Sequence, residues 1–116
     1  MGIFSGIVQK GTSRGAALGF PTANIPLHNP EPSGIYAARV TVKKGEAPYM
    51  AAVFADQKRK LLEAHILDFS DDLYGQHVTV ELHKKLRDVE MFENDEKLRA
   101  TITEDIKKTR GYFESL

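Results

Sequence analysis

Apolar and polar residues alternate along several short stretches of this chain, and alternation of this kind predicts β-strands. In residues 35–43, one face collects the apolar side chains of Tyr36, Ala38, Val40 and Val42. Lys44-Gly45-Glu46 then offers a turn, and Tyr49–Ala55 has the pattern of the returning strand of a hairpin. We expect the first of these strands to bury one face.

Three further stretches fit strands. Residues 3–8 are short with β-branched ends, and residues 77–86 alternate clearly. In residues 61–69, if extended, one face carries Leu62, Ala64 and Ile66, and the other carries Glu63 and His65. Residues 25–34 contain three prolines and a glycine, so we expect a connection over the surface there.

The last segment, about residues 95–113, has the pattern of a helix. Asn94 suits the N-cap, and acidic residues follow it in the first turn. Basic residues gather towards the end of the segment, before Gly111. One apolar stripe, which we expect to pack on the sheet, is formed by Leu98, Ile102, Ile106, Thr109 and Phe113.

Five or six short strands followed by one helix predict a mainly β domain, a small closed antiparallel barrel with a C-terminal α-helix. No linker or internal repeat divides the chain. We therefore expect a single domain over residues 1–116, with the barrel at about 3–90 and the helix at about 95–113. Periodicity alone does not fix the strand order.

The amino-acid composition and net charge limit the kinds of molecule that we expect this chain to bind. Of the 116 residues 41% are hydrophobic and 28% are charged, as in ordinary globular domains. Sixteen basic and sixteen acidic side chains cancel, so we expect neither nucleic acid nor membrane as a partner. Cysteine is absent, and no stretch approaches a membrane span. We expect a cytoplasmic monomer that binds small molecules.

A glycine-rich stretch early in the chain carries candidate chemistry. Its glycines and arginine suit a loop that points backbone N–H groups at a phosphate: Gly11, Arg14, Gly15 and Gly19. In the following Pro21-Thr22-Ala23-Asn24, an extended backbone puts the Thr22 hydroxyl and the Asn24 amide oxygen on one face. Such neutral oxygens suit Mg²⁺ carrying nucleotide phosphates. The alternative is that the glycines and the proline only shape a surface turn.

Glu63 is the candidate general base, because apolar neighbours would raise the proton affinity of its carboxylate. The alternative for Glu63 is a solvated strand carboxylate. We interpret His65 as a structural residue. Asp68, Asp71 and Asp72 lack the glycine and the distal glutamate of an EF-hand calcium loop and are interpreted as turn acids.

Two motifs carry a resemblance to a known family. Leu18-Gly19-Phe20-Pro21-Thr22-Ala23-Asn24 resembles the LGxPTAN signature of riboflavin kinases, and Gly11 with Arg14-Gly15 resembles the loop that precedes it there. The run Glu63–Phe69, followed by Asp72-Leu73-Tyr74-Gly75, is similar to the second signature of that family. A P-loop motif is absent, so the resemblance does not extend to P-loop kinases.

Two weaker matches extend the resemblance along the chain. Gly34-Ile35-Tyr36-Ala37 resembles the GxYA step of the family, and Leu86–Phe92 resembles its LRxExxF segment, with Val89 where glutamate is usual. The resemblance thus covers residues 6–105.

The resemblance implies a six-stranded Greek-key barrel and ATP-dependent phosphorylation of the ribityl 5′-hydroxyl of riboflavin, giving flavin mononucleotide (FMN). It implies ATP as co-substrate and Mg²⁺ as cofactor, with Thr22 and Asn24 as metal ligands and Glu63 as the catalytic base. The nucleotide would be bound by Gly11, Arg14, Gly15, Gly19, Thr22 and Asn24. The flavin would be bound by Arg87 and Phe92.

The chain departs from the family pattern in the connection before Glu63. Val53-Phe54-Ala55 leads straight into Asp56–Lys60, with several residues fewer than usual, and Ala16 replaces a frequent second basic residue. An alternative is therefore a non-catalytic domain that binds flavin or nucleotide. A third hypothesis, a nucleic-acid-binding barrel, is disfavoured by the zero net charge. Many bacterial relatives carry an adenylyltransferase in front of this domain, and 116 residues are too few to include it.

Overall fold

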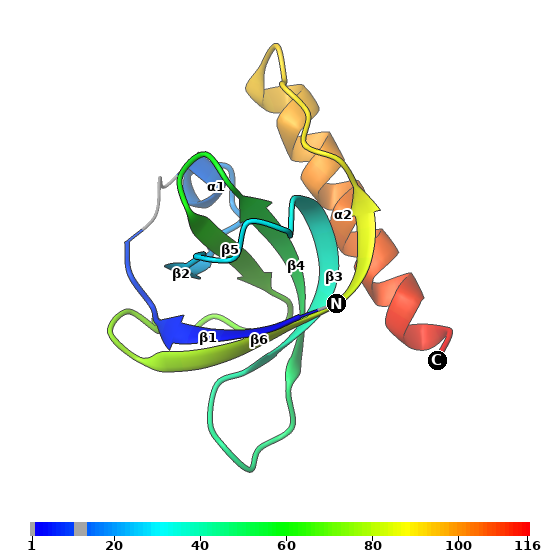
Figure 1. Ribbon diagram of the computed structural model, residues 1–116. Helices are drawn as coiled ribbons and strands as arrows, with labels where there is room; N and C mark the ends of the chain where they lie inside the picture. The colour runs from blue at the N-terminus through cyan, green and yellow to red at the C-terminus, as the bar shows by residue number, and fades with distance from the viewer. Residues whose placement is uncertain (1, 11–13) are drawn as a thin grey trace.

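The computed structural model describes residues 2–10 and 14–116 (Figure 1). In these residues six strands and two helices follow one another. They are β1 (Ile3–Ile7), α1 (Arg14–Ala17), β2 (Ala23–Pro26), β3 (Gly34–Thr41), β4 (Tyr49–Asp56), β5 (Leu61–Ile66), β6 (His77–Arg87) and α2 (Asp95–Glu114). The predicted mainly β class and the helix after the strands are confirmed.

All strand pairs are antiparallel, and the strand order is β1-β6-β3-β4-β5-β2. The two outer strands of this order approach each other at an antiparallel bridge, where the Gln9 N–H donates to the Asn24 carbonyl at 2.8 Å. The sheet is thereby curled into a nearly closed barrel. Register shifts in the β3–β6 pair add curvature, as β-bulges do.

The barrel interior is the hydrophobic core. The largest apolar side chains with almost no exposed surface come from every part of the sheet: Ile25, Leu27, Val40, Val53, Leu62, Val78 and Val80. In β5 the side chains of Leu62, Ala64 and Ile66 point inward, as the alternation predicted.

Helix α2 covers the outer face of β3 and β4 (Figure 1). Asn94 caps the helix, and its Oδ1 accepts from the Lys97 N–H at 2.9 Å. Small side chains on the outer face of the sheet, Ala37 and Ala52, are buried although they point away from the core. The prediction of one buried face for β3 was therefore incomplete, because the helix buries part of the second face.

Two other expectations needed correction. Residues 25–34 are not only a surface connection, because Ile25 belongs to β2 and Leu27 is fully buried. Pro26 is tolerated because β2 is an outer strand of the sheet. The glycine-rich stretch also contains one helical turn, α1, which ends where Gly19 adopts a φ of +95°.

Paired arginine and aspartate side chains fasten α2 to the barrel. Arg87 at the end of β6 donates from Nε and Nη2 to the two carboxylate oxygens of Asp105, at 2.8 and 2.9 Å. Arg110 makes a similar pair with Asp68, just after β5, at 3.0 Å for both bonds. Neither helix within the described ranges is long and apolar enough to cross a membrane.

Candidate active site

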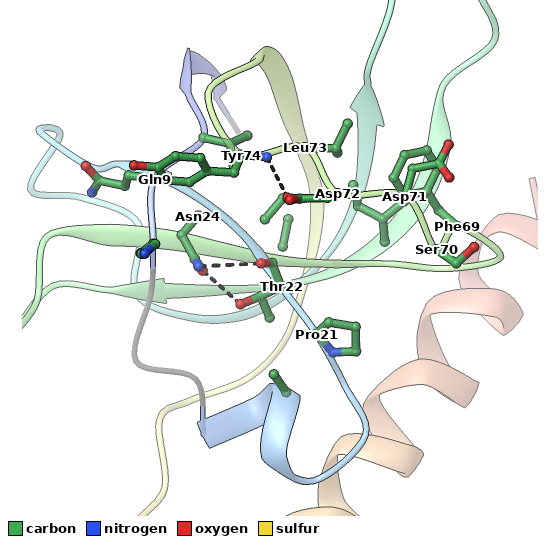
Figure 2. A pocket seen from close by; sticks show the side chains of 16 residues that line it. Gln9, Pro21, Thr22, Asn24, Phe69, Ser70, Asp71, Asp72, Leu73 and Tyr74 are labelled. Carbon is green, nitrogen blue, oxygen red and sulfur yellow. Dashed lines mark hydrogen bonds between the residues drawn. The ribbon is translucent and has the colours of Figure 1, made fainter.

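The start of β2 brings two side-chain oxygens together. The Thr22 hydroxyl donates to Asn24 Oδ1 at 2.9 Å, and the Asn24 amide also lies 3.5 Å from the Thr22 carbonyl. Figure 2 shows the Asn24 amide turned toward Thr22. Because residues two apart in a strand share a face, the extended backbone puts both oxygens on the same side, as the sequence predicted. Asn24 is 4% exposed, which fixes its position.

A pocket of about 700 Å³ opens beside this pair. Figure 2 shows Pro21, Thr22 and Asn24 on one side of it and the turn Phe69–Tyr74 on the other. The remaining lining residues come from the end of β1, from α1, from β2 and from β5: Val8, Gln9, Lys10, Ala16, Ala23, Ala64 and Ile66. The pocket combines apolar walls with a few polar groups, as small-molecule sites usually do.

In the described part of the glycine-rich stretch, Ala16 of α1 lines the same pocket, whereas Gly15 and Gly19 do not. Gly15 lies in α1, where its carbonyl accepts from the Phe20 N–H at 2.7 Å and from the Leu18 N–H at 3.1 Å. Gly19 ends this turn at a φ that favours glycine. Arg14 is the first residue of α1, whereas Gly11 lies outside the described residues.

Glu63 projects from the face of β5 opposite to the core. The sheet register puts it directly across from Asn24 of β2 on one side and Phe54 of β4 on the other. Directly opposed residues in antiparallel strands share a face, so Glu63 and Asn24 are neighbours. Glu63 does not line the pocket, and Asn24 therefore links the pocket to the face that carries Glu63.

The surroundings of Glu63 raise its pKa above the usual glutamate range. Burial is the largest cause, and the negative charge of Asp56 acts in the same direction, with a further hydrogen-bonding contribution from Asp56. The positive charge of Arg59 partly opposes these effects. A half-buried carboxylate with raised proton affinity suits a general base.

The connection between β4 and β5 brings Asp56 and Arg59 close to Glu63. Residues 57–60 form a turn that joins the paired residues Asp56 and Leu61, so the short connection closes a regular hairpin. Asp56 is buried, and its carboxylate accepts from the Arg59 backbone N–H and from Nη1, at 3.1 and 3.2 Å.

His65 has a structural role, as interpreted from the sequence. Its Nδ1 lies 2.8 Å from the Pro21 carbonyl, and its ring meets the Phe20 ring edge-on at 5.6 Å between centroids. The acidic turn behaves as expected too, because Asp72 accepts from the Tyr74 N–H and Asp68 pairs with Arg110. No group of three or more metal-ligating acid or histidine side chains forms in the described part of the chain.

Of the two predicted flavin residues, Arg87 lies at the other end of the same cross-strand row, and Phe92 lies in the segment after β6. The row runs from Arg87 through Ile35 and Phe54 to Glu63 and Asn24. Three strand spacings separate Arg87 from Glu63, about 14 Å. The Arg87 guanidinium lies 5.8 Å from the centre of the Phe92 ring while it pairs with Asp105.

Sequence reasoning missed several residues around the site. Lys10 and Tyr74 line the pocket, with Lys10 Nζ 5.8 Å from the centre of the Tyr74 ring. Asp56 and Arg59 were considered only as part of the short connection before Glu63. Two signals were available in the sequence. Lys10 directly precedes Gly11, and Asp56 directly follows the predicted strand that comes before the Glu63 strand.

Comparison with known proteins agrees with this geometry. The family model described as Flavokinase, riboflavin kinase, matches residues 3–113. The bifunctional riboflavin kinase/FMN adenylyltransferase of Haemophilus influenzae is 37% identical over 118 residues, which cover 95% of this chain. The chain spans 38% of the length of that relative.

Solved structures share the fold. A riboflavin kinase from Trypanosoma brucei has a TM-score of 0.71 and 26% identity, covering 97% of this chain and 79% of that one. A macrolide-efflux protein from Streptococcus pneumoniae has a TM-score of 0.79 and 27% identity, covering 93% of this chain and 38% of that one. With the family match over nearly all of its length, the two signatures and the barrel geometry, this chain belongs to the riboflavin kinase family.

Proposed function

We propose that this domain transfers the terminal phosphate of ATP to the ribityl 5′-hydroxyl of riboflavin, giving FMN. The observation that carries the proposal is the register of β2 and β5, which sets the half-buried Glu63 directly opposite Asn24. The proposed base Glu63 thereby lies beside the side-chain oxygens of Thr22 and Asn24, which suit a metal ion bound to a nucleotide. The proposal is limited to the kinase reaction, because the chain spans only 38% of its bifunctional relative.

The proposed metal ligands fit Mg²⁺. Thr22 Oγ1 and Asn24 Oδ1 are 2.9 Å apart, and neighbouring ligands in an octahedral site with bonds of 2.0–2.1 Å lie about 3 Å apart. Both are neutral oxygens, and two protein ligands suffice when phosphates and water complete the shell. Mg²⁺ bound there would neutralise charge on the phosphates of the nucleotide.

The remaining steps belong to side chains of this domain. Glu63 accepts the proton of the ribityl hydroxyl, and its raised pKa makes it a stronger base than an exposed glutamate. Gly11, Arg14, Gly15 and Gly19 are proposed to hold the phosphates, and the pocket beside them to hold the rest of the nucleotide. Arg87 and Phe92 are proposed to bind the ring end of the flavin, about three strand spacings from Glu63.

The short connection before Glu63 does not favour the non-catalytic alternative. Asp56 and Leu61 are paired across a regular hairpin, so β5 is held in register with both of its neighbours.

We further propose a cytoplasmic monomer that does not bind nucleic acid, since the sequence has no cysteine and no net charge. Light scattering of the purified protein tests the monomer.

The direct test is a chromatographic assay for FMN after mixing the purified protein with riboflavin, ATP and Mg²⁺. We expect FMN only when all three are present. A folded protein that binds flavin or ADP and yields no FMN under these conditions contradicts the kinase proposal and supports the non-catalytic alternative.

A further inference from the structure

Asp56 is a buried carboxylate for which the proposed mechanism has no use. It is 4% exposed, although it ends β4 next to a basic turn. It is paired with Leu61, and Glu63 lies two positions further along β5, on the same face of the sheet. A carboxylate buried this far needs partners that compensate its charge.

The partner of Asp56 is Arg59. The same carboxylate accepts from the Arg59 backbone N–H at 3.1 Å and from the guanidinium Nη1 at 3.2 Å. These two bonds fix both the turn and the direction of the arginine side chain. That side chain keeps 59% of its surface exposed, and of its five N–H donors only one on Nη1 is bound to Asp56.

The register places the guanidinium on the face of the proposed base. Asp56, which binds Arg59, is paired with Leu61 and shares its face with Glu63, two positions further along β5, and the Arg59 charge opposes the rise in the Glu63 pKa. Across the sheet from Glu63 lies Asn24, one of the two proposed metal ligands. Arg59, the proposed base Glu63 and the proposed metal ligand Asn24 therefore belong to the same face of the sheet.

We propose that Arg59 is a catalytic residue that donates hydrogen bonds to the phosphoryl group during its transfer, an inference that rests on the proposed kinase function. In this step a bond forms between the ribityl 5′-oxygen and phosphorus, and the bond from phosphorus to ADP breaks. The hydroxyl proton passes to Glu63, and ADP leaves with the electron pair of the broken bond. Arginine suits the phosphoryl oxygens because its planar fork matches them.

The same turn provides a matched control. Lys58 is exposed and carries the same charge, and the structure gives it no ion pair among the residues it describes. A general effect of positive charge on the nucleotide would be the same for Lys58 and Arg59. A specific contact depends on the arginine that Asp56 holds in place.

The test compares Arg59→Ala, Arg59→Lys and Lys58→Ala in two assays. In the FMN assay we expect kcat to fall at least tenfold in Arg59→Ala, to recover in part in Arg59→Lys, and to stay within twofold in Lys58→Ala. In a binding assay with Mg²⁺ we expect Arg59→Ala to lower the affinity for the non-hydrolysable ATP analogue AMP-PNP more than the affinity for ADP. Thermal unfolding checks that each variant is folded.

A fall in kcat or a selective loss of AMP-PNP affinity, in Arg59→Ala and not in Lys58→Ala, supports the contact. Equal behaviour of these two variants in both assays overturns it. If the wild-type protein makes no FMN, the kinase proposal fails by itself, and the comparison of AMP-PNP with ADP still decides whether Arg59 meets the terminal phosphate.

Discussion

At the scale of single residues, Glu63 illustrates a conflict between stability and chemistry. Its carboxylate is half-buried beside the negative charge of Asp56, which raises the pKa and disfavours the charged form in the folded protein. A solvent-exposed strand position would stabilise the charged carboxylate better. The unfavourable surroundings make the group a better proton acceptor, which is the kind of strain often found at active sites.

Glu63→Gln keeps the size of the side chain and removes the proposed base. We expect kcat for FMN formation to fall by about 10²- to 10⁴-fold, the usual contribution of a general base. Michaelis constants for riboflavin and ATP are expected to change little. Undiminished turnover in this variant would rule out Glu63 as the base.

The same variant has a predicted effect on stability with a definite sign. Since the pKa of Glu63 is raised in the folded state, its stabilising contribution is present at low pH and is lost as the pH rises through the folded-state pKa. Glutamine does not titrate. We therefore expect Glu63→Gln to melt at a higher temperature than the wild type at neutral pH, and the difference to vanish in acid. A melting temperature equal to that of the wild type at every pH contradicts the burial effect.

Thr22→Ala removes one of the two converging oxygens of β2. We expect the affinity for ADP in the presence of Mg²⁺ to fall by about fivefold to tenfold, the equivalent of one hydrogen-bond-sized interaction. Riboflavin affinity is expected to stay within twofold. Thr22→Ser keeps the hydroxyl and serves as the control, and calorimetry measures all three proteins. Equal loss in both variants argues against a metal role for the hydroxyl.

At the scale of elements, one of the two ion pairs that fasten α2 is largely buried. The side chains of Arg87 and Asp105 are 15% and 5% exposed, and two short hydrogen bonds join them. The pair fastens the helix to the end of β6, beside the proposed flavin residues. Gly34 adds to this junction, since its φ of +104° and its closeness to the Arg87 carbonyl leave no room for a side chain.

Asp105→Ala leaves the Arg87 guanidinium buried without its counter-charge. We expect the free energy of unfolding to fall by about 3–5 kcal/mol, as for other broken buried pairs. Asp68→Asn is the matched control, because it breaks the exposed Arg110 pair on the same helix, and we expect little change there. Urea unfolding measures both. Similar losses in the two variants would show that the burial of Arg87 is not decisive.

At the scale of the whole molecule, core and site share the same strand. In β5 the inward side chains fill the barrel, and the side chains of Glu63 and His65 point outward. The strand that carries the proposed base is therefore packed against the core on its other face. Such an arrangement positions a side chain more precisely than a surface loop does.

Leu62→Ala tests that dependence. Leu62 has no exposed surface, and we expect the free energy of unfolding to fall by about 2–5 kcal/mol, as for other buried leucines. The reduction in FMN formation at a given temperature should follow the fraction of unfolded protein. Full activity in a variant that is mostly unfolded by circular dichroism contradicts this coupling.

The sequence by itself determined five of the six strands, all but β2, together with the capped helix and the residues of the two signatures, because alternation, capping and turn chemistry are local properties. Beyond the β3–β4 hairpin it did not determine which strands pair, so the row that joins Asn24, Glu63 and Phe54 became visible only in the fold. It also left Leu27 outside the core and Asp56 in the connection before Glu63, since burial depends on distant elements. Local chemistry chose the candidates, and long-range packing decided which of them meet.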